Sequence, residues 1–177
     1  MPTLELLNRE VIPGEIASLI DDAPLPSIGE SGANLPCESV ELALKSANLQ
    51  GTLAEAGLWL LAGELDRSHG ISQDNDSSLG SYWHGIMHRR EGDFGNAKYW
   101  FRRVGKCHLF DDLAEHVSNH QDQLLSGLPL SDLNSGSRIA EALVDCSQAA
   151  LTNQSDWIDD IATICWWEWQ LLFSASL

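Results

Sequence analysis

Two histidines and a glutamate follow one another at helical spacing near the middle of the chain: His84, His88 and Glu91. Residues four and seven positions apart share one face of an α-helix, so we expect these three side chains on the same side. Neutral imidazole nitrogens and a carboxylate are ligands for divalent metal ions. His69, just after the preceding predicted helix, or Glu64 within that helix could complete the ligand shell. The sequence therefore offers a divalent-metal site at His69, His84, His88 and Glu91.

Other interpretations of these histidines stay open. The His-Glu-x-x-His pattern of zinc proteases is excluded, because Gly85 follows the first histidine. The imidazoles could instead be hydrogen-bonded between two helices, face water, or take part in acid–base catalysis. A second pair, His116 and His120, has the same spacing in more acidic company. We interpret this second pair as a solvated helix face.

Six of the ten Lys and Arg residues lie between positions 89 and 106. That window contains only two acids and carries +4, which leaves −20 for the rest of the chain. Its four arginines present planar donors suited to carboxylate or phosphate, and they are Arg89, Arg90, Arg102 and Arg103. They could bind a small anionic ligand or a protein partner, or they could pair internally. Acids for the favoured internal pairing include Asp21-Asp22, Asp111-Asp112 and Asp159-Asp160.

The overall charge and hydropathy limit the classes of partner and the cellular compartments that we expect for this protein. A formal net charge of −16 repels nucleic acid and anionic membranes, so we expect neither as a partner. No run of 18 apolar residues is present, and the N-terminus lacks a signal-peptide pattern. The cysteines are widely spaced, as in the reduced proteins of the cytoplasm, and they are Cys37, Cys107, Cys146 and Cys165. We expect a cytoplasmic protein.

Apolar periodicity and its breaks predict an all-α fold, a single-domain bundle of about six or seven helices. Five of the six prolines fall within the first 36 residues, which predicts an extended segment at 1–36, ahead of an all-α domain at 37–177. Gly70 is the expected end of the second helix, and 73–78 is an expected polar loop. The helices are expected at 38–49, 52–67, 79–91, 94–104, 111–125, 137–150 and 155–173.

One stretch resembles a single tetratricopeptide repeat. The residues that carry the resemblance are Gly85, Gly92, Asp93, Phe94, Ala97 and Phe101. In that family two antiparallel helices touch at small residues, here Gly85 and Ala97, and a Gly-Asp pair makes the turn. The departures from the family pattern are Ser81, His84 and His88, and Leu109 in place of a proline. The resemblance implies a helical hairpin, and with one unit visible it leaves a repeat array open.

The sequence also resembles a family of hypothetical proteins. The resemblance rests on residues 82–105, which begin Tyr-Trp-His-Gly-Ile-Met-His-Arg-Arg-Glu-Gly-Asp-Phe, and on 168–173, Glu-Trp-Gln-Leu-Leu-Phe. That family has no assigned activity, so the resemblance implies no catalytic residues.

The last predicted helix is rich in tryptophan, with Trp157, Trp166, Trp167 and Trp169. Such a wide apolar arc is buried among several helices, or it joins two copies in a homo-oligomer. No phosphate-binding loop, dinucleotide fingerprint or serine nucleophile elbow occurs in the sequence. We therefore expect a non-catalytic helical protein-interaction or ligand-binding module. The alternative is a small metal-binding protein or a His-dependent enzyme centred on His69, His84 and His88.

Overall fold

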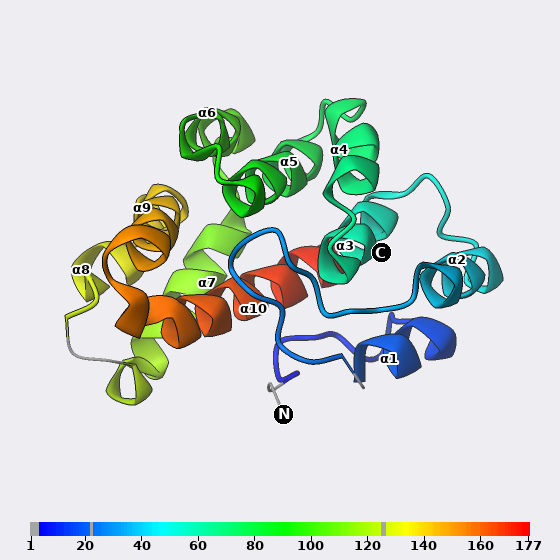
Figure 1. The fold of residues 1–177 in the computed structure, drawn as a ribbon, viewed down its shortest axis with the longest axis horizontal. Coiled ribbons are helices and arrows are strands. Elements are labelled where there is room, and N and C mark those ends of the chain that lie inside the picture. Colours follow the sequence, from blue (N-terminus) through cyan, green and yellow to red (C-terminus); the bar gives the residue numbers. More distant parts are fainter. Residues whose placement is uncertain (1–3, 22, 125–126) are drawn as a thin grey trace.

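The computed structural model describes residues 4–21, 23–124 and 127–177 (Figure 1). Over these residues the protein is all-α and has no strand, as predicted. The α-helices are α1 Gly14–Asp21, α2 Cys37–Ser46, α3 Leu53–Ala62, α4 Leu65–Gln73, α5 Ser78–Glu91, α6 Phe94–Val104, α7 His108–Asn119, α8 Leu130–Leu133, α9 Ile139–Thr152 and α10 Ile158–Ala175. Two 3₁₀ helices, η1 Gln121–Gln123 and η2 Ser155–Trp157, complete the described elements.

The longest helix, α10, crosses the middle of the molecule and contacts α3, α7 and α9 (Figure 1). Its tryptophans Trp166, Trp167 and Trp169 are only 2%, 4% and 5% exposed. Trp169 donates its indole N–H to the Gly57 carbonyl over 2.9 Å. These three tryptophans therefore belong to the core. The alternative of a tryptophan surface shared with a second copy is wrong for them, because this chain's own helices cover the rings.

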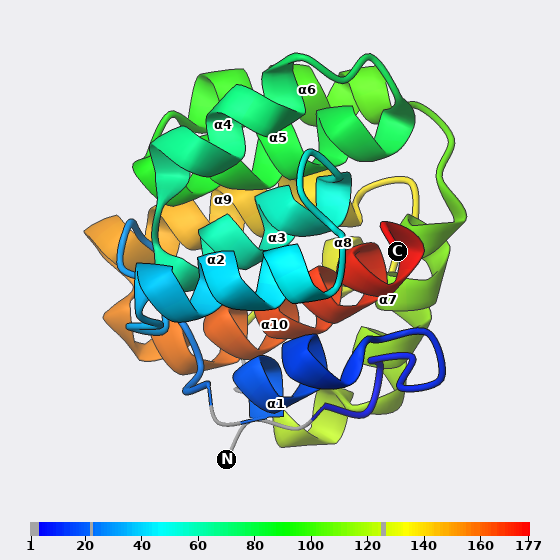
Figure 2. The same ribbon diagram turned by 90° about the vertical axis from the view of Figure 1, so that its right-hand side faces the viewer.

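Helix α5 is the second buried helix, and every residue from Gly80 to Arg90 is buried. It packs against α3, α4 and α6; Figure 2 shows α4, α5 and α6 together in its upper part, with α3 below them. A glycine allows the approach to α3: a Cβ on Gly57 would lie 2.7 Å from the Trp83 ring. Trp83 is in turn held by the hydrogen bond from its Nε1 to Ser176 Oγ, 2.9 Å long.

The hairpin of α5 and α6 forms as predicted. Gly92 ends α5 in a left-handed conformation (φ 86°), and the Asp93 side chain then accepts from the Asn96 backbone N–H at the start of α6. At the helix contact, a Cβ on Gly85 would lie 3.2 Å from the Phe101 ring. Ala97 is fully buried. A repeat array stays a prediction.

The prediction of one helix over 52–67 that stops near Gly70 is wrong. Gly63 ends α3 with a φ of 88°, and α4 begins at Leu65 and continues through Gly70 to Gln73. The physical reason is a long-range contact, since a Cβ on Gly63 would lie 2.7 Å from the Gly32 nitrogen. The extra helix matters for function, because it carries His69 alongside α5 instead of into a loop.

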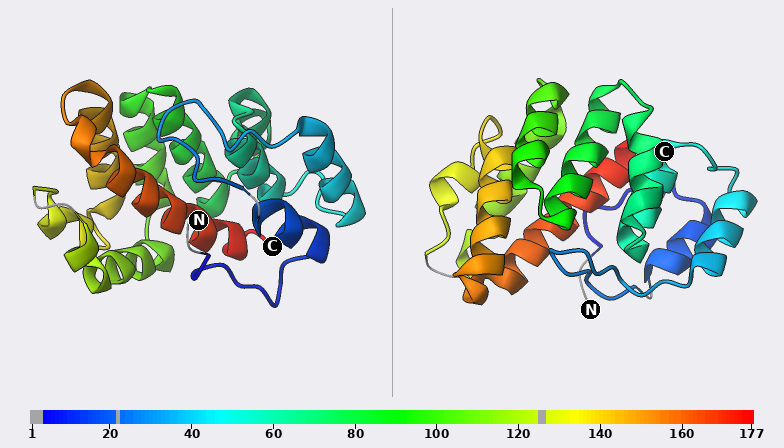
Figure 3. Two further views of the ribbon diagram at one scale, coloured as in Figure 1. Left: turned by 60° about the horizontal axis from the view of Figure 1, so that its bottom comes forward. Right: turned by 45° about the horizontal axis from the view of Figure 1, so that its top comes forward.

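The N-terminal segment differs from the predicted extended chain, because it contains α1, anchored by the buried residues Ile16 and Ile20. Ahead of α1, the Leu6 N–H donates to Gln170 Oε1 (3.2 Å) and the Asn8 N–H donates to Ser174 Oγ (3.0 Å). The segment thus follows the C-terminal half of α10 (Figure 3). None of the helices in the described part of the chain combines the length and the apolar composition that spanning a bilayer requires.

Candidate metal centre

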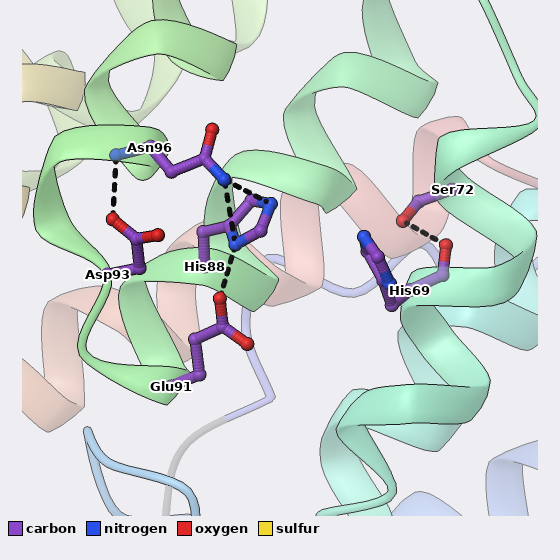
Figure 4. Close-up of polar contacts among 6 residues, drawn as sticks. All are labelled: His69, Ser72, His88, Glu91, Asp93 and Asn96. Atoms are coloured by element: carbon purple, nitrogen blue, oxygen red, sulfur yellow. Dashed lines mark hydrogen bonds and ion pairs between the residues drawn. The ribbon is translucent and has the colours of Figure 1, made fainter.

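Three of the predicted metal ligands come together between α4 and α5. His84 and His88 lie one turn apart on α5, and His69 projects from α4 toward them; Figure 4 shows His69 and His88 on the facing helices. The register of α5 is fixed at its start by Ser77, whose hydroxyl accepts from the Gly80 N–H over 3.0 Å. Two independent helices therefore hold the three imidazoles.

The imidazole rings are close enough to share one ion. Their centroids are 4.7 Å apart for His69–His84, 4.7 Å for His84–His88 and 5.5 Å for His69–His88. One nitrogen from each ring lies within 4.8 Å of the other two. Tetrahedral zinc with bonds of about 2.0–2.1 Å needs donors roughly 3.3–3.4 Å apart. To share one ion, the rings would therefore have to turn toward one another.

His84 is the least hydrated member of the cluster. It is 2% exposed, and its ring lies between the Trp100 ring (centroids 3.8 Å apart, planes at 13°) and the His88 ring. Burial, then the neighbouring His88, His69 and Arg103, lower the pKa of His84 to about 4. The ring is therefore neutral at neutral pH. Its Nδ1 is buried without a hydrogen-bond partner, an uncommon state for a polar atom and one that a ligand would relieve.

His88 is oriented by two neighbours (Figure 4). Its Nδ1 lies 2.5 Å from Glu91 Oε1, and its Nε2 lies 3.0 Å from Asn96 Nδ2. A carboxylate accepts, so Nδ1 carries the proton, and the Nε2 lone pair accepts from the Asn96 amide. A metal bound at Nε2 would replace this hydrogen bond from Asn96. In metal sites, the second ring nitrogen of a metal-binding imidazole often donates to a carboxylate, and this hydrogen bond fixes the tautomer.

Glu91 therefore lies behind His88 and is not in the group of three imidazoles. With His88 and Asp93 it forms a separate, more exposed group of oxygen and nitrogen donors. Glu64, the other predicted candidate, lies elsewhere and accepts from the Cys37 thiol over 3.3 Å. The predicted ligand set stays a prediction for His69, His84 and His88, and for Glu91 the geometry favours an orienting role.

Two of the four arginines are buried and fully engaged. Arg89 forms a two-pronged ion pair with Glu168, and both side chains are at most 1% exposed. Arg90, 7% exposed, donates to the backbone carbonyls of Gly29, Glu30, Ser31 and Leu60. These guanidinium groups brace the core and the N-terminal segment, and neither faces solvent.

The other two arginines lie on the exposed side of α6. Arg102 pairs with Glu141 over 2.9 Å, and Arg103 lies over the Trp100 ring, 5.0 Å from its centroid. Internal pairing is thus observed for Arg89 and Arg102. The partners of these two arginines are Glu168 of α10 and Glu141 of α9 instead of the predicted aspartates. Asp21 pairs with Arg9, and Asp22 lies outside the described residues.

Sequence reasoning missed Trp100 and Asn96 as parts of this site. Trp100 is stacked on His84, and Asn96 donates to His88, both from α6. The signal was present in the hairpin resemblance, because two antiparallel helices joined by Gly92-Asp93 must bring the first turns of α6 against the last turns of α5.

The comparisons with known proteins add no further assignment: no protein-family model matches the sequence, and neither the curated proteins nor the solved structures give a significant match. The fold and the site define an all-α protein with a three-histidine cluster between α4 and α5.

Proposed function

We propose that the protein binds a divalent transition-metal ion through His69, His84 and His88. The observation that carries the proposal is the buried, unpartnered Nδ1 of His84 within a cluster whose three ligand nitrogens lie within 4.8 Å. A buried polar atom without a partner costs about 1–3 kcal/mol, and such a cost persists where a ligand compensates for it.

The donor set selects the class of metal. Imidazole nitrogens favour zinc, copper, nickel and iron, whereas magnesium and calcium favour oxygen donors. Three protein ligands leave a fourth position for water or for a small anion. The proposal thus keeps the predicted ligand-binding module and names a divalent cation as its primary ligand.

The proposal is tested by calorimetric titration of metal-stripped protein with Zn²⁺. His69→Gln, His84→Gln and His88→Gln should each weaken the same binding event by at least about tenfold, and Glu91→Gln should weaken it by about tenfold through the orientation of His88. The matched control is His108→Gln, because His108 is exposed at the start of α7 and away from the cluster.

Thermal melts of each variant in chelator establish that the variants fold. If the three cluster variants fold and bind Zn²⁺ as tightly as the parent and His108→Gln do, the proposal is wrong. Absence of zinc binding by the folded parent would overturn it equally.

A further inference from the structure

His116 and His120 are not the solvated helix face that the sequence predicts. The His116 side chain is 13% exposed, and both rings pack on Trp167 of α10, with centroids at 4.5 Å and 5.4 Å. Glu5 of the N-terminal segment contacts His116, and its carboxylate lies within 4.8 Å of a ligand atom of His120. The two histidines therefore lie in a half-buried junction between three parts of the chain: the N-terminal segment, α7 and α10.

The hydrogen bonds of this junction leave metal-binding atoms in reach of one another. His120 Nδ1 lies 2.9 Å from the His116 carbonyl, which can only accept, so Nδ1 carries the proton and Nε2 keeps the lone pair. Burial and then His120 lower the pKa of His116, although Glu5 opposes the shift.

The spacing also suits an ion. His116 Nε2 and Glu5 Oε1 are 3.1 Å apart, close to the separation of roughly 3.3–3.4 Å between two ligands of tetrahedral zinc. A ligand atom of His120 lies within 4.8 Å of both. A divalent ion could therefore take the place of the proton shared by Glu5 and His116 with little movement of the backbone.

We infer that Glu5, His116 and His120 form a second metal site, which clasps the N-terminal segment onto α7. The site is independent of the three-histidine cluster, because it shares no residue with that cluster. It joins positions 111 residues apart in the sequence. Without the ion, residues 4–8 are held by the buried Leu7 and by the hydrogen bonds to Gln170 and Ser174. A bound ion would add a further contact, because Glu5 can coordinate it only while the segment is docked.

The second metal site predicts that zinc lowers the fraction of molecules in which the N-terminal segment is detached from α7. An ion that binds the docked state more tightly, because Glu5 is a ligand only there, suppresses opening by at most the factor 1 + [metal]/Kd, about 100-fold at a free metal concentration of 100 Kd. Hydrogen exchange of the Leu6 and Asn8 amides reports this opening, because both amides are hydrogen-bonded to α10 side chains in the docked state.

The experiment uses the full chain carrying His84→Gln, with Zn²⁺ or with chelator, so that the first cluster does not contribute. Zn²⁺ should slow exchange at Leu6 and Asn8 in this background. The effect should disappear when Glu5→Gln or His116→Gln is added. Glu5→Gln is the sharper variant, since Glu5 is at the surface and glutamine keeps its shape.

Exchange of the amides in α10 reports on the fold of every variant, and His88→Gln replaces His84→Gln if the latter does not fold. No slowing by Zn²⁺ in a folded protein overturns the inference, as does equal slowing with and without Glu5→Gln. Both results are distinct from failure of the first site, which this experiment does not use.

Discussion

The Arg89–Glu168 pair gives the sharpest test of how the core supports the proposed site, because Arg89 follows the proposed ligand His88 on α5. Removing one partner of a fully buried ion pair leaves an uncompensated charge and costs about 3–5 kcal/mol. The pair is at most 1% exposed, so solvent screening does not reduce this figure. Arg89→Met and Glu168→Gln should therefore each lower the free energy of unfolding by about 3–5 kcal/mol.

The double variant separates the charge effect from lost packing. With both charges gone, no buried ion is left unpaired, and glutamine still offers an oxygen to the neighbouring Tyr82, whose pKa is raised by burial and then by Glu168. Arg89→Met/Glu168→Gln should thus be more stable than the sum of the single effects predicts, by about 2–3 kcal/mol.

The assay is urea unfolding at neutral pH followed by circular dichroism, with chelator present. Single effects below about 1 kcal/mol would refute the reasoning, because they would place the pair in contact with water. Additive effects would refute it as well, because they would mean that the two charges do not stabilise each other.

Three further perturbations follow from the same structure. Gly85→Leu should cost about 1–3 kcal/mol or more in urea unfolding, because a Cβ already meets Phe101 at 3.2 Å; parental stability would mean that the helices do not touch there. Arg102→Ala should leave the free energy of unfolding close to the parental value in the same assay, since its pair with Glu141 is exposed, and a clear loss would contradict this assignment. The folded-state pKa of His84, about 4, lies below its usual value of 6.5, so the folded state binds fewer protons and loses stability as the pH falls from about 6.5 to about 4. Between about pH 7 and pH 5 the metal-free parent should lose about 2 kcal/mol more than His84→Gln, and equal losses would place His84 in water.

Local spacing was sufficient to predict the hairpin and the shared face of His84 and His88. Both depend on the 3.6-residue period and on the turn at Gly92, which are properties of adjacent residues. His69 was a candidate from its place after a helix, and it reaches the cluster because α4 turns back alongside α5.

Contacts between residues that are far apart in the sequence could not be predicted. Gly63 ends α3 because Gly32 packs against it, and Glu168 neutralises Arg89 from 79 positions away. Neither contact leaves a local pattern. The same holds for Glu5, which reaches His116 across 111 positions and changes a predicted surface pair into a junction.

The central claim, a metal site of three imidazoles, is tested most directly by observing the histidine rings themselves. A long-range ¹H–¹⁵N correlation spectrum of the side chains, recorded before and after the addition of Zn²⁺, reports each ring nitrogen separately. The account predicts that one nitrogen in each of His69, His84 and His88 shifts together with the same zinc dependence, while the His108 ring is unchanged. A protein that binds zinc while these three rings keep their metal-free shifts would contradict it.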